Sequence, residues 1–411
     1  MSAESGSVPY DRSRATDEGK RKMLIGRPSI QPSSRHVTWG VSVRFNDGTQ
    51  DFLWFRVPQA YGDMLTERSD PALVALLLPA MLGGEDIHAE GECSPDLLHQ
   101  LRSDLMHVLH RLLPEHREIV ITSGSTGQMV GPAAGVATGF SAGVDSFSTL
   151  VDHYYAEDLP GGTGITHLLY TNVGSHGKRG AVKFRERLER LRPTARAIGL
   201  PLIEVDSNLD SFITTSFKRT HTLRNAAVAL LLQRGIGRFY YSAAYSYDGT
   251  AIRADAPIAA ADPIVLPLLS HASLSLRSSG SRHRRVDKIA RVAEITTSHD
   301  TLDVCVSEGI TTRNCSRCSK CLRTLLTLEI CGALERYEAA FDLDLYRANR
   351  RSFIAHELSS RNPHARENVM FAREHNFAVP TTCRLAAPGL QLGALGARSV
   401  RWARRHVVGG G

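Results

Sequence analysis

The sequence predicts an α/β fold, in which a doubly wound parallel sheet follows an N-terminal α+β domain and precedes a helical C-terminal extension. Two observations support this class. From residue 135 the chain alternates short apolar runs with longer runs of helical periodicity, which is typical of strand–helix units. The short runs are largely apolar throughout, as expected for strands of a parallel sheet that helices cover on both faces.

The N-terminal part has its own pattern of elements. Residues 1–35 are polar and rich in Ser and Arg, which predicts a flexible arm. Two strand-like runs then flank the Asn-Asp-Gly tripeptide at 46–48, a typical hairpin turn. An apolar helix, a second helix that begins at the N-cap Ser94, and one more strand follow. Residues 36–125 are therefore predicted to form an α+β domain.

A strand–helix repeat is predicted over residues 135–300. Its strands are expected over 135–140, 165–173, 201–209 and 238–245, with helices between them. Residues 301–335 hold a cysteine cluster and a helix. Residues 336–411 are predicted to form a helical extension that ends in a basic tail.

Composition and charge limit the classes of partner that we expect for this chain. The chain has 411 residues and a formal net charge of +7. No apolar run is long enough to span a bilayer, and the N-terminus lacks the apolar core of a signal peptide, so we expect a cytoplasmic protein. The basic runs lack a zinc-finger, helix-turn-helix or RNA-recognition signature, so we expect a small-molecule substrate rather than nucleic acid. A homodimer remains open.

Four of the seven cysteines crowd into one short segment. Cys315, Cys318 and Cys321 have the spacing of a tight turn, and Cys305 lies one loop upstream. In a reducing compartment such clustering favours a metal over disulfides. Four thiolates make a closed, structural zinc site, and the sequence leaves free thiols or an iron–sulfur cluster as alternatives.

The segment SAGVDS, residues 141–146, follows the first strand of the repeat. In open α/β sheets ligands bind at the carboxyl ends of strands, beside helix N-termini whose unpaired N–H groups attract anions. Gly143 lets the backbone approach a ligand closely, and Asp145 fits a magnesium ion or an orienting role. The predicted nucleotide-binding residues here are Ser141, Ala142, Gly143, Val144, Asp145 and Ser146. An ordinary strand-to-helix corner is the alternative.

This segment resembles the SGGxDS loop of the PP-loop ATPases, also called N-type ATP pyrophosphatases. Ala142 replaces the first glycine, and we expect its methyl group to be tolerated if the backbone φ stays negative. Together with the four cysteines, the order of motifs over about 137–334 resembles the 7-cyano-7-deazaguanine synthase-like branch of the queuosine pathway. The resemblance implies an adenine nucleotide alpha hydrolase-like fold, with ATP, Mg²⁺ and Zn²⁺ as cofactors. It also places Arg224 and Asn225 near the nucleotide.

The implied chemistry is the ATP-dependent activation of a carboxylate or carbonyl oxygen by adenylation, followed by transfer of a nitrogen nucleophile. Asp145, Ser146 and Arg224 are the predicted catalytic residues. Arg285 and Lys288 are predicted to close over the phosphates, and His176 and Asp248 to meet the substrate. Two alternatives remain: sulfur transfer through Cys93, Cys331 or Cys383, and a non-enzymatic nucleotide- or nucleic-acid-binding module.

Overall fold

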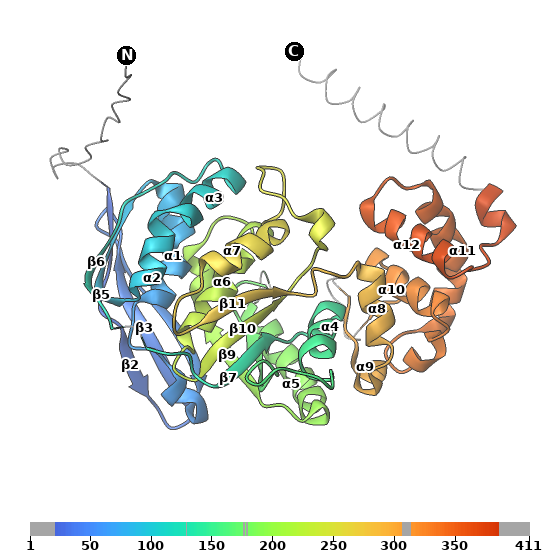
Figure 1. Ribbon diagram of the computed structural model, residues 1–411, viewed down its shortest axis with the longest axis horizontal. Helices are drawn as coiled ribbons and strands as arrows, with labels where there is room; N and C mark the ends of the chain where they lie inside the picture. Colours follow the sequence, from blue (N-terminus) through green and yellow to red (C-terminus); the bar gives the residue numbers. More distant parts are fainter. Residues whose placement is uncertain (1–20, 129, 176, 178–179, 306–313, 386–411) are drawn as a thin grey trace, which may run out of the picture.

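The computed structural model describes residues 21–128, 130–175, 177, 180–305 and 314–385 (Figure 1). These residues form a mixed α/β fold with a large, mostly parallel sheet and helices on both sides. The sheet has 11 strands within the described residues, in the order β11-β10-β7-β8-β9-β4-β3-β1-β5-β6, with β2 beside β3.

The parallel half of the sheet contains the predicted strand–helix repeat. Its strands are β7 (Gly135–Gly139), β8 (His167–Thr171), β9 (Leu202–Ser207), β10 (Ile236–Ser242) and β11 (Ser275–Ser279). The helices are α4 (Val144–His153), α5 (Gly180–Ile198), α6 (Phe217–Leu231) and α7 (Asp262–Leu268). The sequence pattern missed β11 because this edge strand is mostly polar.

The N-terminal half of the sheet is mixed in direction. Its strands are β1 (Lys22–Ile25), β2 (Ser29–Pro32), β3 (His36–Arg44), β4 (Gln50–Pro58), β5 (Asp86–Cys93) and β6 (Ile121–Thr126). The helices are α1 (Asp70–Gly83), α2 (Pro95–Arg102) and α3 (Asp104–Leu112). The predicted hairpin at 46–48 is confirmed, since β3 and β4 pair antiparallel and Gly48 has a φ of +83°.

Two local predictions are wrong in this half. Residues 22–32, assigned to a flexible arm, form β1 and β2 and pair with β3. The helix predicted from Ser94 breaks at Ser103, which divides it into α2 and α3. Ser94 does not cap α2 with its side chain; its Oγ donates to Asp70 Oδ2 at 2.6 Å instead.

The two halves form one sheet through β4 and β9. Phe55 pairs with Ser207 in this antiparallel contact. The side chain of Asn208 extends the junction, because its Oδ1 accepts from Trp54 N at 2.9 Å and its Nδ2 donates to Phe52 O at 2.8 Å. The hydrogen-bonded ladder is therefore continuous from the N-terminal strands to β7.

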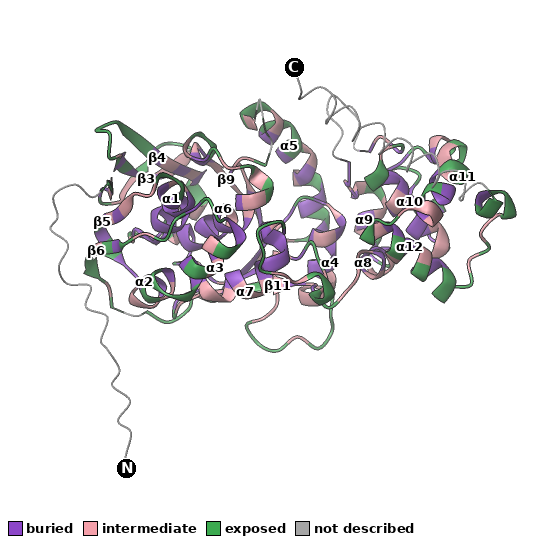
Figure 2. Ribbon diagram, turned by 90° about the horizontal axis from the view of Figure 1, so that it is seen from above, coloured by how far each residue is buried: buried purple, intermediate pink, exposed green. Residues whose placement is uncertain are grey.

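Alternating side chains of the parallel strands bury two separate cores. Ala137 and Leu169 face the core shared with α1 and α6, whereas Val136 and Leu168 face the core shared with α4 and α5. This alternation follows from the two-residue period of a strand. Figure 2 shows the buried residues concentrated between the sheet and the helices that flank it.

The described residues of the C-terminal part, from 285 to 385, are mainly helical. The helices are α8 (Arg285–Val292), α9 (Thr296–Thr301), α10 (Ser319–Ile330), α11 (Leu343–Ser359) and α12 (Pro363–Glu374). In Figure 1 they lie together beyond α4, on the side of the molecule away from β6. The predicted basic tail falls mostly in 386–411, outside the described residues. Within the described part of the chain, no helix combines the length and apolar character needed to cross a bilayer.

Candidate functional site

The segment SAGVDS connects the central strand of the parallel half to a helix. Phe140 N donates to Leu169 O at 2.8 Å, so the chain leaves the sheet directly after β7. Helix α4 then begins at Val144. Its N-cap residue is Gly143, so no side chain of the N-cap accepts a hydrogen bond from the first N–H groups of the helix. The first backbone N–H groups of a helix have no intrahelical acceptor, so this N-terminus is suited to an anion.

Ala142 adopts a conformation that favours glycine. Its φ is +56° and its side chain is buried, which corrects the expectation of a negative φ. A non-glycine residue in the left-handed region costs about 1–2 kcal/mol. The surrounding structure holds it there, since the carbonyl oxygen of Ala142 accepts from Asp303 N at 2.8 Å. Such strain is concentrated at functional sites.

Asp145 is the charged centre of the loop. Its carboxylate accepts from Arg285 Nη1 and lies 3.4 Å from Lys288 Nζ. Lys288 is buried and also donates to Ala243 O, at 2.6 Å, just beyond β10. Burial would raise the pKa of Asp145, but the two cations lower it below its usual value. The carboxylate is therefore ionised at neutral pH, and it fixes two cations beside the N-terminus of α4.

The two loop serines differ in what they offer a ligand. Ser146 is buried, and its Oγ donates to Gly143 O at 2.9 Å, which closes the loop on itself. Ser141 is exposed, and its Oγ accepts weakly from Gly143 N at 3.4 Å. Ser141 is thus the more available hydroxyl, whereas Ser146 maintains the shape of the loop.

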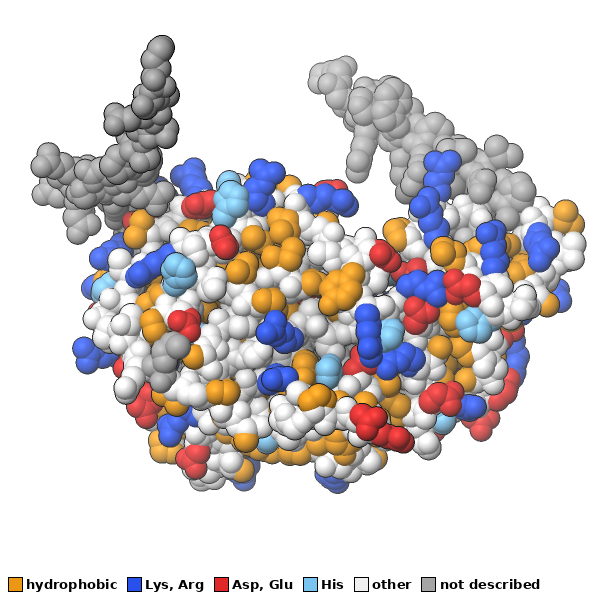
Figure 3. All heavy atoms as spheres, viewed as in Figure 1, with side chains coloured by type: hydrophobic (Ala, Val, Ile, Leu, Met, Phe, Trp, Pro, Cys, Tyr) orange, Lys and Arg blue, Asp and Glu red, His pale blue; other side chains and the backbone are white. Residues whose placement is uncertain are grey.

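Neighbouring arginines of the basic stretch point elsewhere. Arg282 Nη2 donates to Asp152 Oδ1 at 2.8 Å. Arg284 binds both Asp287 and Glu374, at 2.9 and 2.7 Å. Figure 3 shows the same mixture at larger scale, with acidic and basic side chains intermingled on the visible face where the C-terminal helices meet the sheet. Of these cations, the structure brings only Arg285 and Lys288 to Asp145.

Arg224 is held by internal hydrogen bonds, and its catalytic role stays a prediction. The side chain is 2% exposed, and its guanidinium donates to Val173 O at 2.8 Å and to Asp210 Oδ1 at 2.6 Å. Its Nε donates to Thr220 Oγ1 at 2.8 Å. Arg224 therefore fixes the turn after β8. Gly174 in that turn has a φ of +103°, and a Cβ there would lie 2.2 Å from Arg224 Nη1.

The remaining predicted residues occupy different surroundings. Asn225 links α6 to the carboxyl end of β8, since its Oδ1 accepts from Thr171 Oγ1 at 3.0 Å. Asp248 is exposed in a short 3₁₀ turn (Tyr247–Gly249) after β10, and a substrate contact there stays a prediction. His176 lies outside the described residues.

The four predicted cysteines come together. The Sγ atoms of Cys305, Cys315, Cys318 and Cys321 all lie within 4.8 Å of one another. Cys321 Sγ is 3.9 Å from Cys315 Sγ and 3.5 Å from Cys318 Sγ. Tetrahedral zinc with bonds of about 2.3 Å separates sulfur atoms by about 3.8 Å, so this cluster fits a metal such as zinc.

Asn314 joins the cluster to the loop, and the motif analysis missed it. It is 6% exposed; its Oδ1 accepts from Val304 N at 3.0 Å and its Nδ2 donates to Leu302 O at 2.8 Å. The clamped segment carries both Cys305 and Asp303, the donor to Ala142 O. No sequence signal marks these contacts, because they are made to backbone groups that only the fold brings beside Asn314.

No protein-family model, no curated protein and no solved structure matches this chain. The site is therefore interpreted from its own geometry.

Proposed function

We propose that the chain is a PP-loop ATP pyrophosphatase-type enzyme that adenylates a carboxylate or carbonyl oxygen of a small molecule and then joins it to a nitrogen nucleophile. The observation that carries the proposal is the loop over 141–146. It combines an uncapped helix N-terminus, a left-handed Ala142 and a carboxylate that anchors Arg285 and Lys288. These features together suit a polyphosphate.

The order of the strands in the sheet supports placing the nucleotide at the 141–146 loop. From the central β7 the chain adds β8 and β9 on one side and then β10 and β11 on the other. We interpret this parallel half as doubly wound. Ligands of doubly wound sheets bind at the carboxyl edge where the direction of strand addition reverses, which here lies beside β7 and β10. The 141–146 loop follows β7, and Ala243 directly follows β10.

In this proposal the phosphates of ATP lie against the backbone N–H groups of Gly143, Val144 and Asp145, with the hydroxyl of Ser141 at the exposed edge. Arg285 and Lys288 stabilise the charge that develops on departing pyrophosphate. Magnesium would supply further charge neutralisation. Asp145 can serve as its ligand only by releasing one of its two cationic partners, so its first role is to position them.

The reaction proceeds in two displacements. An oxygen of the acceptor attacks the α-phosphorus, the bond between the α-phosphorus and the bridging oxygen breaks, and pyrophosphate leaves. The nitrogen nucleophile then attacks the activated carbon, the carbon–oxygen bond breaks, and AMP leaves with the acceptor oxygen while the nitrogen loses a proton. Four thiolates leave zinc no open position, so the cysteine cluster supports the fold and is not a catalytic centre.

The three cysteines outside the cluster give less support to sulfur transfer than the loop gives to adenylation. Burial raises the pKa of Cys93 to about 12 and that of Cys331 to about 11, so both are neutral thiols at physiological pH. Cys383 is 2% exposed, and its Sγ donates to Arg351 O. A thiolate is the reactive form, and the surroundings of Cys93 and Cys331 disfavour it.

The test is product analysis with ATP, Mg²⁺, ammonium and a panel of small carboxylic acids. The expected product is AMP with pyrophosphate. Asp145→Asn should lower the rate at least about 100-fold, because both cations lose the charge that positions them. Asp152→Asn is the matched control: it lies in the same helix and also binds two arginines, but these ion pairs lie away from the loop. We expect it to retain the rate within about fivefold.

Formation of ADP and orthophosphate would reject the proposed cleavage. Equal rates in wild type and Asp145→Asn would remove the loop from the mechanism. Nucleotide binding without any turnover, across the whole panel of acids, would favour the non-enzymatic module instead.

A further inference from the structure

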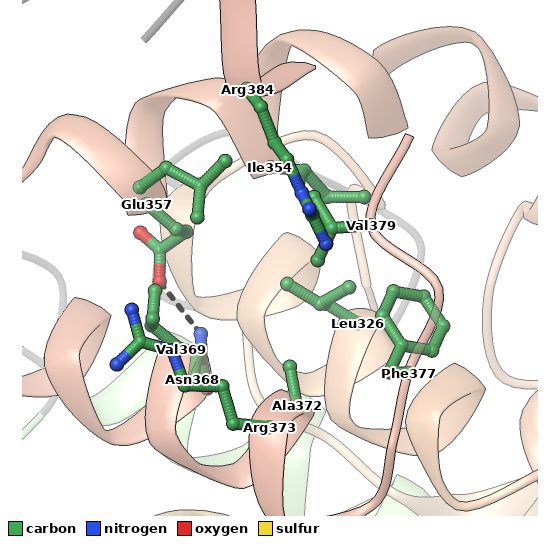
Figure 4. A pocket seen from close by; sticks show the side chains of 11 residues that line it. Leu326, Ile354, Glu357, Asn368, Val369, Ala372, Arg373, Phe377, Val379 and Arg384 are labelled. Carbon is green, nitrogen blue, oxygen red and sulfur yellow. Dashed lines mark hydrogen bonds between the residues drawn. The ribbon is translucent and has the colours of Figure 1, made fainter. Parts of the chain in front are cut away.

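A cavity lies among the C-terminal helices, and none of its lining residues belongs to the 141–146 loop. It has a volume of about 440 Å³, and helices α10, α11 and α12 with the segment after them form its walls (Figure 4). Leu326, Ile354, Val369, Ala372, Phe377 and Val379 supply an apolar lining. This volume and lining are in the range of small-molecule sites in proteins.

A buried polar pair interrupts the apolar wall. Asn368 is 1% exposed, and its Nδ2 donates to Glu357 Oε2 at 2.7 Å. Its Oδ1 is buried and has no hydrogen-bond partner among the described residues. Burying an unsatisfied amide oxygen costs about 1–3 kcal/mol, so the position favours a ligand that donates a hydrogen bond.

Two arginines complete the lining. Arg373 comes from α12, and Arg384 comes from the short helical segment 381–385 that follows it in the chain. Both are exposed, and no side-chain ion pair or hydrogen bond joins either guanidinium to another described residue. Figure 4 shows Arg384 extending past Ile354 and Val379 along the cavity. The cavity therefore combines an apolar body, one buried acceptor and two available cations.

We propose that this cavity binds a small amphipathic organic acid. Its apolar part lies between α10, α11 and α12, a hydroxyl or amide N–H donates to Asn368 Oδ1, and its carboxylate pairs with Arg373 or Arg384. The site is independent of the proposed adenylation chemistry, because it uses none of the loop residues.

Calorimetric titration of the full-length chain tests the proposal with two probes of equal length, ω-hydroxydecanoate and the corresponding diol. The wild type should bind the acid roughly fivefold to tenfold more tightly than the diol, since only the acid pairs with the arginines. Replacing both Arg373 and Arg384 by Ala should lower the affinity for the acid to that for the diol. Arg366→Ala is the control, because this exposed arginine of α12 does not line the cavity.

Ala372→Phe fills the cavity and should abolish binding of both probes, provided that circular dichroism shows a folded chain. The arginine variants keep the proposal testable even if Ala372→Phe unfolds, because both arginines are exposed. Absence of binding to the wild type would overturn the site, and equal affinities for acid and diol would overturn the acid class. Probe binding that persists in folded Ala372→Phe would place the ligand elsewhere. A change of oligomeric state in that variant, with no probe binding in wild type, would assign the cavity to a second copy of the chain.

Discussion

Two carboxylates of this chain, one half-buried and one fully buried, have opposite surroundings. Asp145 lies between Arg285 and Lys288, which lower its pKa despite burial. Asp262 forms no ion pair with any cation that the structure describes. Burial raises its pKa to about 8, while a hydrogen bond from Thr222 opposes this rise. A Coulombic partner thus decides whether a buried acid is ionised at neutral pH. Of the two, only Asp145 has the charge that the proposed chemistry needs.

The ion pairs of Asp145 predict a specific pH dependence. A carboxyl group whose folded pKa is depressed stabilises the fold above the unfolded pKa of about 3.9, and this contribution is lost as pH falls through the folded value. The free energy of unfolding of the wild type should therefore fall more steeply between pH 5 and pH 3 than that of Asp145→Asn. Urea titrations at several pH values measure this difference. Parallel curves for the two proteins would show that the ion pairs do not stabilise the fold.

The raised pKa of Asp262 predicts that the stability of the fold changes with pH in the opposite direction. Its folded pKa lies above its unfolded pKa, so the folded state retains a proton that the unfolded state releases, and stability falls as pH rises from about 4 to about 8. Asp262→Asn keeps the shape but removes this titration. We expect the variant to gain stability relative to wild type between pH 5 and pH 7.5, again by urea unfolding. A constant difference over that range would contradict the raised pKa.

At the scale of elements, a backbone contact connects the loop over 141–146 to the cysteine cluster. Asp303 donates to Ala142 O, and Cys305 follows two residues later in the chain. Asn314 holds this segment through bonds to Leu302, Val304 and Ala340. A metal bound by the cysteines would therefore fix the segment on which the loop rests.

Asn314→Ala should destabilise the fold by about 2 kcal/mol, because buried backbone groups lose their partner. Asn349→Ala is the control, since this amide makes one bond within α11, to Leu345 O. Its cost should stay below about 1 kcal/mol. Hydrogen exchange should also rise at 302–305 and 140–143 in the first variant alone. Unchanged exchange at 140–143 would show that the segment does not support the loop.

The left-handed backbone of Ala142 gives a second test at this scale. Ala142→Gly relieves strain but loses a buried methyl group and gains freedom in the unfolded chain, so the stability should change by less than about 1 kcal/mol. Ala142→Val places a β-branched side chain at positive φ and should cost more than about 1.5 kcal/mol. Thermal unfolding of both variants measures the difference. Equal stabilities of the glycine and valine variants would mean that the loop can also adopt a negative φ at position 142.

For the whole molecule, periodicity predicted the strand–helix repeat, and the hairpin at 46–48 was found from its turn residues alone. The edge strands β2 and β11 were not, because an edge strand is held by backbone hydrogen bonds that leave no apolar signature. Strand β1 lies between β3 and β5, but its four residues are too short a run to be distinguished in sequence from the polar arm before it. Spacing was enough to group four cysteines. It was not enough to show that Arg224 is buried in internal hydrogen bonds, because that depends on distant acceptors such as Val173 O.

Metal content is a property of the whole chain. We expect one zinc ion per chain by elemental analysis, and Cys318→Ser should lose it, because a four-thiolate site tolerates few changes. A chelator should lower the melting temperature of the wild type and leave that of Cys318→Ser unchanged. Iron in place of zinc, with visible absorption, would assign a cluster of the iron–sulfur kind instead.

The central claim is that a triphosphate lies against the turn between β7 and α4. Hydrogen exchange of the full chain, with and without α,β-methylene-ATP and Mg²⁺, measures this contact directly. We expect slower exchange over 140–147 when the nucleotide is bound, and loss of that protection in Asp145→Asn. Nucleotide binding that leaves exchange at 140–147 unchanged, while it slows exchange elsewhere, would contradict it.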